Sequence, residues 1–295
     1  MDAVTRDTFG RVGIWSLGLS GTTADATRQS EIAEAVAELE ELGYGTVWLG
    51  GSPSIADAAA VLAATRRITV ATGILSIWDH TAQDVAAQVA ELEEETPGRF
   101  VLGLGVSHSV VTPRYTRPYT SMVEYLDALD GAPVPVPPGR RVLAALGPKM
   151  IALAAERTLG AHPYLVTAEH TARARTLMGP DALLAPELKV VLDGDLDRAR
   201  AVARQTLAFY LRVPNYVGNL RRLGFEEDEL AGGGADRVVD ALFALGDAER
   251  AASRVREHLE AGADHVSVQV VTEGAPGGPP PRAAWRELAA ALPLR

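Results

Sequence analysis

The chain has 295 residues, 47% of them hydrophobic, no cysteine, and a formal net charge of −10 at pH 7. The charge argues against a nucleic-acid or anionic-membrane partner, and the missing cysteine excludes disulfides, thiolate catalysis and zinc–sulfur sites. The sequence shows neither a basic-then-apolar signal segment nor an apolar run of about eighteen residues, so we expect a cytoplasmic protein without a membrane span.

Short apolar runs alternate with helical patterns along the sequence. The runs predict eight strands, at residues 11–15, 46–49, 68–75, 100–106, 142–146, 164–166, 188–192 and 265–268. The longest helical stretch, residues 195–246, follows the seventh strand. This alternation predicts a (β/α)8 TIM barrel with a helical insertion between strands 7 and 8, forming one domain over residues 1–295. A doubly wound open sheet is less favoured, because residues 13–21 do not supply a Gly-x-Gly-x-x-Gly turn.

The end of the fifth strand predicts an anion site. The apolar run stops at Gly147-Pro148, and helix-forming sequence begins at once with Lys149. Proline fits the first turn of a helix because its missing N–H is not needed there. The free amides of such a turn attract phosphate, so we expect the amides of residues 147–150, more than the Lys149 ammonium, to bind an anion.

Residues that follow barrel strands build the working face of the fold. Here they are glycines, indoles and imidazoles, with one carboxylate, Asp79. A glycosidase needs two carboxylates, and a metallohydrolase needs several converging His and Asp ligands, so neither class is predicted and no metal site is expected. Glycines and flat rings instead suit a planar cofactor. We expect pocket walls at Trp15, Gly50 and Trp78.

Several segments carry a family resemblance, and they occur in a characteristic order. They are Leu39-x-x-x-Gly43-x-x-x-Val47-Trp48, Ala71–Ile74, Arg99-Phe100-x-Leu102-Gly103-x-Gly105–His108, Ala145–Met150, Gly160–Thr171 and Ala261–Val266. Through them, residues 10–272 resemble the bacterial luciferase-like superfamily, specifically its coenzyme F420-dependent oxidoreductases. The resemblance implies a (β/α)8 barrel that passes a hydride between C5 of the deazaflavin and a small organic substrate. It also implies a homodimer.

The resemblance further implies which residues contact the cofactor. The Gly73–Ile74 bond matches a position where relatives carry a non-proline cis peptide against the middle ring of the deazaflavin. The implied contacts are Gly73, Ile74, Leu75, Gly105, Val106, Ser107, His108, Leu146, Gly147, Pro148, Lys149, Met150, His162 and Pro163. One residue must also donate a proton, and imidazole titrates nearest neutral pH. The candidates are His80, His108 and His162.

One departure from the family pattern keeps the reaction open. The sugar-phosphate dehydrogenases of the family carry an Asp-His pair after the second strand, where this sequence has Gly50-Gly51. The alternatives are an FMN-dependent luciferase-like monooxygenase and a barrel that binds a ligand without catalysis.

Two further histidines have structural interpretations: His265 is expected in the framework at the closed end of the barrel, and His170 as a capping or surface residue. Residues 207–230 are expected to roof the pocket or meet a second subunit.

Overall fold

The computed structural model describes residues 6–19, 25–274 and 276–294. The strands are β1 Val12–Ser16, β2 Thr46–Leu49, β3 Thr69–Thr72, β4 Leu75–Ser76, β5 Phe100–Gly105, β6 Arg141–Leu143, β7 Gly160–Ala161, β8 Leu183–Leu184, β9 Glu187–Leu192, β10 Phe243–Gly246 and β11 Val266–Val270. The helices are α1 Arg6–Phe9, α2 Ala26–Leu42, α3 Ile55–Ala63, α4 Ala82–Glu95, α5 Pro118–Asp130, α6 Pro148–Arg157, α7 Ala168–Met178, α8 Leu196–Tyr210, α9 Pro214–Arg222, α10 Asp236–Leu242, α11 Ala248–Glu260 and α12 Arg282–Ala291, with a 3-10 turn at Pro138–Arg140.

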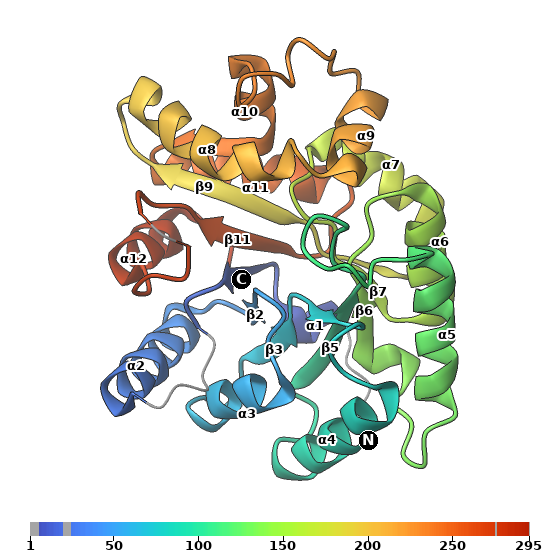
Figure 1. Cartoon of the computed structure of the whole chain (residues 1–295). Helices are drawn as coiled ribbons and strands as arrows, with labels where there is room; N and C mark the ends of the chain where they lie inside the picture. Colours follow the sequence, from blue (N-terminus) through green and yellow to red (C-terminus); the bar gives the residue numbers. More distant parts are fainter. Residues whose placement is uncertain (1–5, 20–24, 275, 295) are drawn as a thin grey trace.

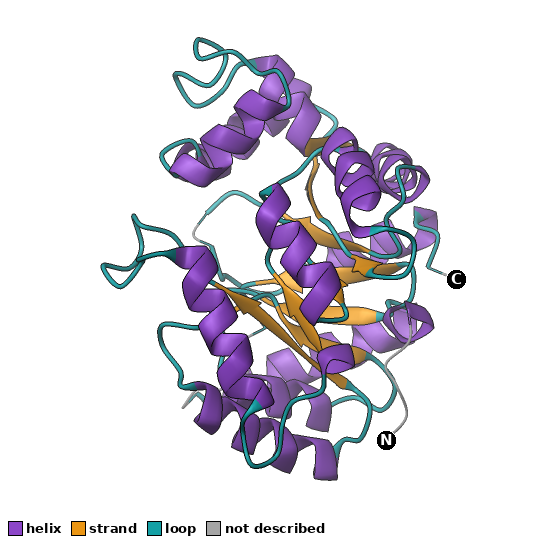
Figure 2. Cartoon of the chain, turned by 90° about the vertical axis from the view of Figure 1, so that its right-hand side faces the viewer, coloured by secondary structure: helices purple, strands orange, loops and turns teal. Residues whose placement is uncertain are grey.

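The strands form a parallel sheet that closes through one interrupted strand. β8 pairs with β7, and β9, slightly further along the chain, pairs with β11. Between them Ala185 N donates to Ala161 O and Ser267 N donates to Pro186 O, each at 2.9 Å. β11 pairs in turn with β1, which completes the ring. The predicted barrel is therefore confirmed, with helices packed around the strands (Figure 1 and Figure 2).

Alternate residues of each strand face two different cores, because strands of a barrel are buried on both sides. The outer core lies between strands and helices and includes Ile14 and Val47. The inner core fills the barrel and contains Phe9, Trp15, Trp48, Ala71, Val101, Val142, Leu183 and Ala185. Phe9 of α1 lies 5.8 Å from the Trp48 ring, and His265 Nδ1 lies 2.8 Å from Gly10 O. These contacts close the N-terminal end of the barrel, and the structural interpretation of His265 is confirmed.

The sixth strand differs from the prediction. It is β7, Gly160–Ala161, whereas residues 164–166 lie outside any strand. Pro163 has no N–H to donate, and Leu165 has a φ of 55°, which is incompatible with extended backbone. The apolar run at 164–166 is buried for another reason, since Leu165 packs against the insertion.

The insertion between the seventh and eighth barrel strands is largely helical, as predicted, and Figure 1 shows α8, α9 and α10 gathered on one side of the barrel. The prediction of helix throughout 195–246 is wrong at its end, where β10 pairs with β9. No glycine or proline separates α10 from β10, so the run Leu242-Phe243-Ala244-Leu245 continues the helical pattern in the sequence. Within the described ranges, no helix is long and apolar enough to cross a bilayer.

Candidate functional site

A cavity of about 610 Å³ opens at the C-terminal end of the barrel strands, a size typical of small-molecule sites. Its wall comes from the ends of β1 and β11, from α8, and from the loop between β11 and α12. Among the described residues of this wall, Glu273 is the one charged side chain. Arg28 ties the loops above the cavity together, because its Nη2 donates to Gly18 O (2.8 Å) and to Gly278 O (3.1 Å).

Trp15 forms one wall of the cavity, as predicted. Its Nε1 donates to Gly73 O at 2.9 Å, and the residue is only 6% exposed. The indole lies on Gly50, where an added Cβ would come 2.4 Å from the Trp15 ring. Gly50 is consequently buried under Trp15 and does not line this cavity. The glycine is needed so that the indole can lie across the strand ends.

A buried ion pair lies on β9, on the side that faces the barrel interior. Lys189 Nζ donates to Glu187 Oε1 at 2.8 Å and to Gln269 Oε1 at 2.9 Å. Glu187 Oε2 accepts from Leu165 N at 3.0 Å. Lys189 is 0% and Glu187 1% exposed. Burial lowers the pKa of Lys189 to about 8 and raises the pKa of Glu187, because desolvation disfavours both charges.

Two tyrosines connect this ion pair to the cavity. Tyr164 OH donates to Gln269 Oε1 at 2.8 Å, and Tyr210 OH donates to Tyr164 OH at 2.9 Å. Lys189 Nζ lies 3.7 Å from the centroid of the Tyr164 ring, which is cation–π distance. Tyr164, Tyr210 and Gln269 all line the cavity. The result is a connected polar group of five side chains, three of which a ligand in the cavity could reach.

The residues predicted to hold a cofactor lie along neighbouring strands. β4 pairs with β5, β5 with β6 and β6 with β7, so their C-terminal ends are adjacent. Partly exposed residues form a strip there, which we call the strand-end strip: Ile74, Val106, Ser107, His108, Leu146 and Gly147. The Gly73–Ile74 bond is cis, as predicted. The strip does not contribute to the 610 Å³ cavity.

Other predicted cofactor contacts are inaccessible. Leu75 is 0% exposed and belongs to the outer core, so its side chain faces the helices. His162 and Pro163 are buried as well, and so are Gly73 and Gly105. An added Cβ at Gly105 would come 2.4 Å from Ile74 Cδ1, so the Ile74 side chain covers this glycine.

The turn that precedes α6 is open. Gly147 is the N-cap, no side chain caps the helix, and an added Cβ at Gly147 would meet no atom within 4 Å. The backbone hydrogen bonds of the turn run from Met150 N and Ile151 N to Gly147 O. Pro148 and Lys149 are exposed, and Met150 is half-buried. The first turn of a ten-residue helix is thus accessible to an anion.

The luciferase-like monooxygenase family model matches residues 11–265. The chain belongs to this family. No curated protein sequence matches the chain significantly.

Several solved structures share the luciferase-like fold. The coenzyme F420-dependent tetrahydromethanopterin reductase from Methanopyrus kandleri is 18% identical, with a TM-score of 0.73 and coverage of 96% of this chain and 98% of that one. An F420-dependent secondary alcohol dehydrogenase with an F420–acetone adduct is 15% identical, with a TM-score of 0.71 and coverage of 97% and 98%. The oxygenating component of 3,6-diketocamphane monooxygenase from Pseudomonas putida, in complex with FMN, is 14% identical, with a TM-score of 0.65 and coverage of 96% and 98%. At these identities the likeness shows the fold.

In this luciferase-like barrel the three candidate histidines occupy different environments. His162 stacks on Trp48 at 4.1 Å in the inner core, and its Nδ1 is 2.7 Å from Ala185 O. Burial lowers its pKa to about 3, so it is neutral and remote from solvent. His108 lies against the Tyr216 ring at 5.3 Å, and its imidazole has a hydrogen bond with Asn215, although its buried Nδ1 has no partner within hydrogen-bond distance among the described residues. Burial also lowers the pKa of His108. We therefore do not retain His162 as a proton donor.

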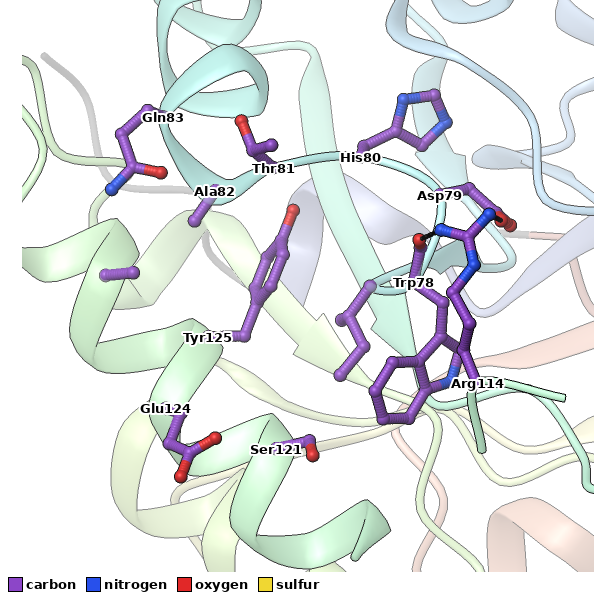
Figure 3. A pocket seen from close by; sticks show the side chains of 12 residues that line it. Trp78, Asp79, His80, Thr81, Ala82, Gln83, Arg114, Ser121, Glu124 and Tyr125 are labelled. Carbon is purple, nitrogen blue, oxygen red and sulfur yellow. Dashed lines mark hydrogen bonds and ion pairs between the residues drawn. The ribbon is translucent and has the colours of Figure 1, made fainter. Parts of the chain in front are cut away.

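His80 and Trp78 belong to a separate hollow of about 470 Å³ between the loop before α4 and helix α5. In Figure 3 the His80 side chain points away from Tyr125 and Glu124. Trp78 Nε1 donates to Val106 O at 2.5 Å, so the indole braces the strand-end strip from outside. Neither residue lines the 610 Å³ cavity, so Trp78 is not part of its wall and His80 does not face it.

His170 is buried, so the surface alternative is wrong, and in the N-terminal cap of α7 its backbone N donates to Thr167 Oγ1. Its Nε2 lies 3.0 Å from Leu146 O and fixes the strand end before the open turn. Residues 207–230 do cover the mouth of the barrel: Phe209 and Tyr210 line the cavity, and Tyr216 lies beside His108.

Proposed function

We propose that the protein is an F420-dependent oxidoreductase that transfers a hydride between coenzyme F420 and a small organic substrate. The observation that carries the proposal is the open, uncapped first turn of α6 at the end of the partly exposed strand-end strip. A phosphorylated planar cofactor needs both features: amides for its anionic end and an accessible row of backbone and small side chains for its ring system.

The residues present fit such a group. The turn at Gly147 would bind the phosphate through backbone amides, with the exposed Lys149 ammonium nearby. Ile74, beside the cis bond, and Val106 to His108 would contact the ring system and its side chain. His108, at the end of this strip, offers an imidazole to such a ligand. The bound cofactor would supply the hydride chemistry, while the protein positions the substrate and moves a proton.

Two of the structural neighbours named above are F420-dependent, and they have higher TM-scores than the FMN-bound monooxygenase. This favours F420. The family as a whole is described as monooxygenases, which supports an FMN-dependent monooxygenase as the second candidate.

The test is cofactor binding by the purified protein. Titration with F420 and separately with FMN, followed by fluorescence, should show binding of F420 and weak or absent binding of FMN. Lys149→Glu should weaken F420 binding about fivefold, which corresponds to about 1 kcal/mol at a helix N-terminus. Arg256→Glu makes the same charge change at an exposed residue of α11 and should have no effect.

Tight binding of FMN without F420 would replace the proposal with the monooxygenase. Binding of neither cofactor would favour a non-catalytic barrel. Equal weakening by both charge reversals would mean that the α6 turn is not the anion site.

A further inference from the structure

The cavity adjoins the strand-end strip at Trp15, whose Nε1 donates to Gly73 O next to Ile74. A substrate in the cavity beside the cofactor therefore needs a proton source on the cavity side. The candidate histidines do not provide one, because none of the three lines the cavity. The acidic hydrogens that do face it belong to the hydroxyls of Tyr164 and Tyr210, which are bonded to each other at 2.9 Å.

We propose that Tyr210 donates the proton to the substrate, that a hydrogen bond from Tyr164 stabilises the resulting Tyr210 phenolate, and that the substrate is an uncharged ketone or aldehyde. This inference rests on the proposed function, since it needs the hydride that the cofactor supplies. It goes further in naming the proton donor and the substrate class.

Proton transfer to the substrate requires both hydroxyls to turn, because Tyr210 OH donates to Tyr164 OH and Tyr164 OH donates to Gln269 Oε1. The carbonyl carbon gains the hydride, the electron pair of the C=O π bond moves to oxygen, and this oxygen takes the proton of Tyr210 OH. Tyr164 turns its hydroxyl hydrogen from Gln269 to the Tyr210 oxygen and stabilises the negative charge there. An alcohol and a Tyr210 phenolate result, and a proton from solvent restores the phenol after the alcohol leaves.

Burial raises the pKa of both phenols, and their mutual hydrogen bond then raises that of Tyr164 and lowers that of Tyr210, so charge is favoured on Tyr210. Lys189 Nζ is 3.7 Å from the Tyr164 ring centroid and 5.4 Å from that of Tyr210. Glu187, also on β9, opposes ionisation of both phenols, and the Tyr216 ring of α9 packs edge-on against Tyr210 with the ring centroids 5.0 Å apart. Burial raises the pKa of Tyr210 to about 12, so that it holds its proton at neutral pH and can act as a donor.

The wall of the cavity indicates the substrate class. Apolar and aromatic residues dominate it, among them Val202, Phe209, Val271 and Trp285. No Lys, Arg or His contributes to the described wall, and its one charge is the carboxylate of Glu273. An anionic substrate would have to give up its hydration without gaining a cation, which is costly. An uncharged carbonyl compound needs only one hydrogen-bond donor, and Tyr210 provides it.

Binding to the protein without cofactor provides a readout that does not depend on turnover. Trp15 and Trp285 line the cavity, so cyclohexanone should change tryptophan fluorescence on binding. Tyr210→Phe should weaken this binding about tenfold, the equivalent of one lost hydrogen bond. Tyr216→Phe, which removes a phenol oxygen from the same aromatic group outside the bonded pair, should not. The carboxylated analogue 4-oxocyclohexanecarboxylate should bind at least tenfold more weakly.

Turnover with reduced F420 tests the proton transfer itself. Tyr210→Phe should lower kcat for cyclohexanone reduction by about 10² to 10⁴ with F420 binding unchanged. Tyr164→Phe should lower kcat by at least tenfold, with a smaller change in KM. Wild-type kcat in Tyr210→Phe, an equal loss in Tyr216→Phe, or preference for the carboxylated analogue would each overturn the inference. If F420 does not bind, the proposed function fails. Ketone binding to the protein without cofactor still tests the inference: weaker binding in Tyr210→Phe would support Tyr210 as the hydrogen-bond donor to the ketone, and unchanged binding in Tyr210→Phe would refute it.

Discussion

Replacing Lys189 by methionine tests how the buried ion pair contributes to stability. Glu187 would lose the 2.8 Å bond from Nζ and keep only the bond from Leu165 N. Removing one partner of a buried pair costs about 3–5 kcal/mol, because a charge is left without compensation. We expect Lys189→Met to lower the free energy of unfolding by about 3 kcal/mol at pH 7.5.

The loss should depend on pH in a defined direction. Burial already raises the pKa of Glu187, and removing the ammonium raises it further. In the unfolded chain the carboxyl ionises at about pH 4.3. Between that pH and the raised folded pKa, the folded state binds a proton that the unfolded state does not, so stability falls as pH rises. The cost of Lys189→Met should therefore be smaller at pH 5.5 than at pH 7.5.

The assay is urea unfolding at both pH values. It compares the wild type, Lys189→Met and the double variant Glu187→Gln/Lys189→Met. The double variant removes both charges and keeps an acceptor for Leu165 N, so its stability should return to within about 1 kcal/mol of wild type. A cost below about 1 kcal/mol for Lys189→Met, or the same cost at both pH values, would refute the reasoning.

Three further predictions concern the framework. Burial lowers the pKa values of His162, His258 and His265 to about 3, 3 and 4, so each resists the proton that the unfolded chain accepts below about pH 6.5. Stability should thus decline as pH falls from 6.5 toward 4, by up to about 1.4 kcal/mol per pH unit for each histidine; a flat profile in urea unfolding would contradict this. Gly103→Ala should cost about 3 kcal/mol or more, since the new Cβ would come 1.8 Å from Thr72 O, whereas Gly139→Ala, with open space around it, should leave the melting temperature unchanged. Trp15→Ala should cost about 3–5 kcal/mol in chemical denaturation and enlarge the cavity; a smaller cost would mean that the indole is not part of the inner core.

Much of the barrel could be predicted because its strands are buried on both faces and read as apolar runs. The exceptions have local causes. β7 consists of two residues, Gly160 and Ala161, and so gives no hydrophobic run, while the apolar residues 164–166 follow it in a non-extended conformation. β10 follows α10 without a breaking residue, so periodicity alone could not separate them.

The site was less predictable, because the sequence interpretation considered only residues that follow the strands, whereas the buried ion pair lies within β9. The sequence does contain a signal for the buried ion pair: Glu187 and Lys189 alternate with Leu188 and Val190, which places two charges on one face of a strand. The predicted strand began at residue 188 and so left out Glu187, the first residue of this alternation. The bond between Tyr164 and Tyr210 could not be predicted, since it joins the loop after β7 to a helix residue 46 positions further along the chain.

The ring of strands also constrains how the chain can be made. β1 finds its second neighbour only in β11, so the N-terminal strand remains open on one side until residues 266–270 have been synthesised. Open strand edges template pairing with other chains. A product that stops before Val266 would carry two such edges, one on β1 and one on β9, and we expect it to aggregate where the complete chain folds.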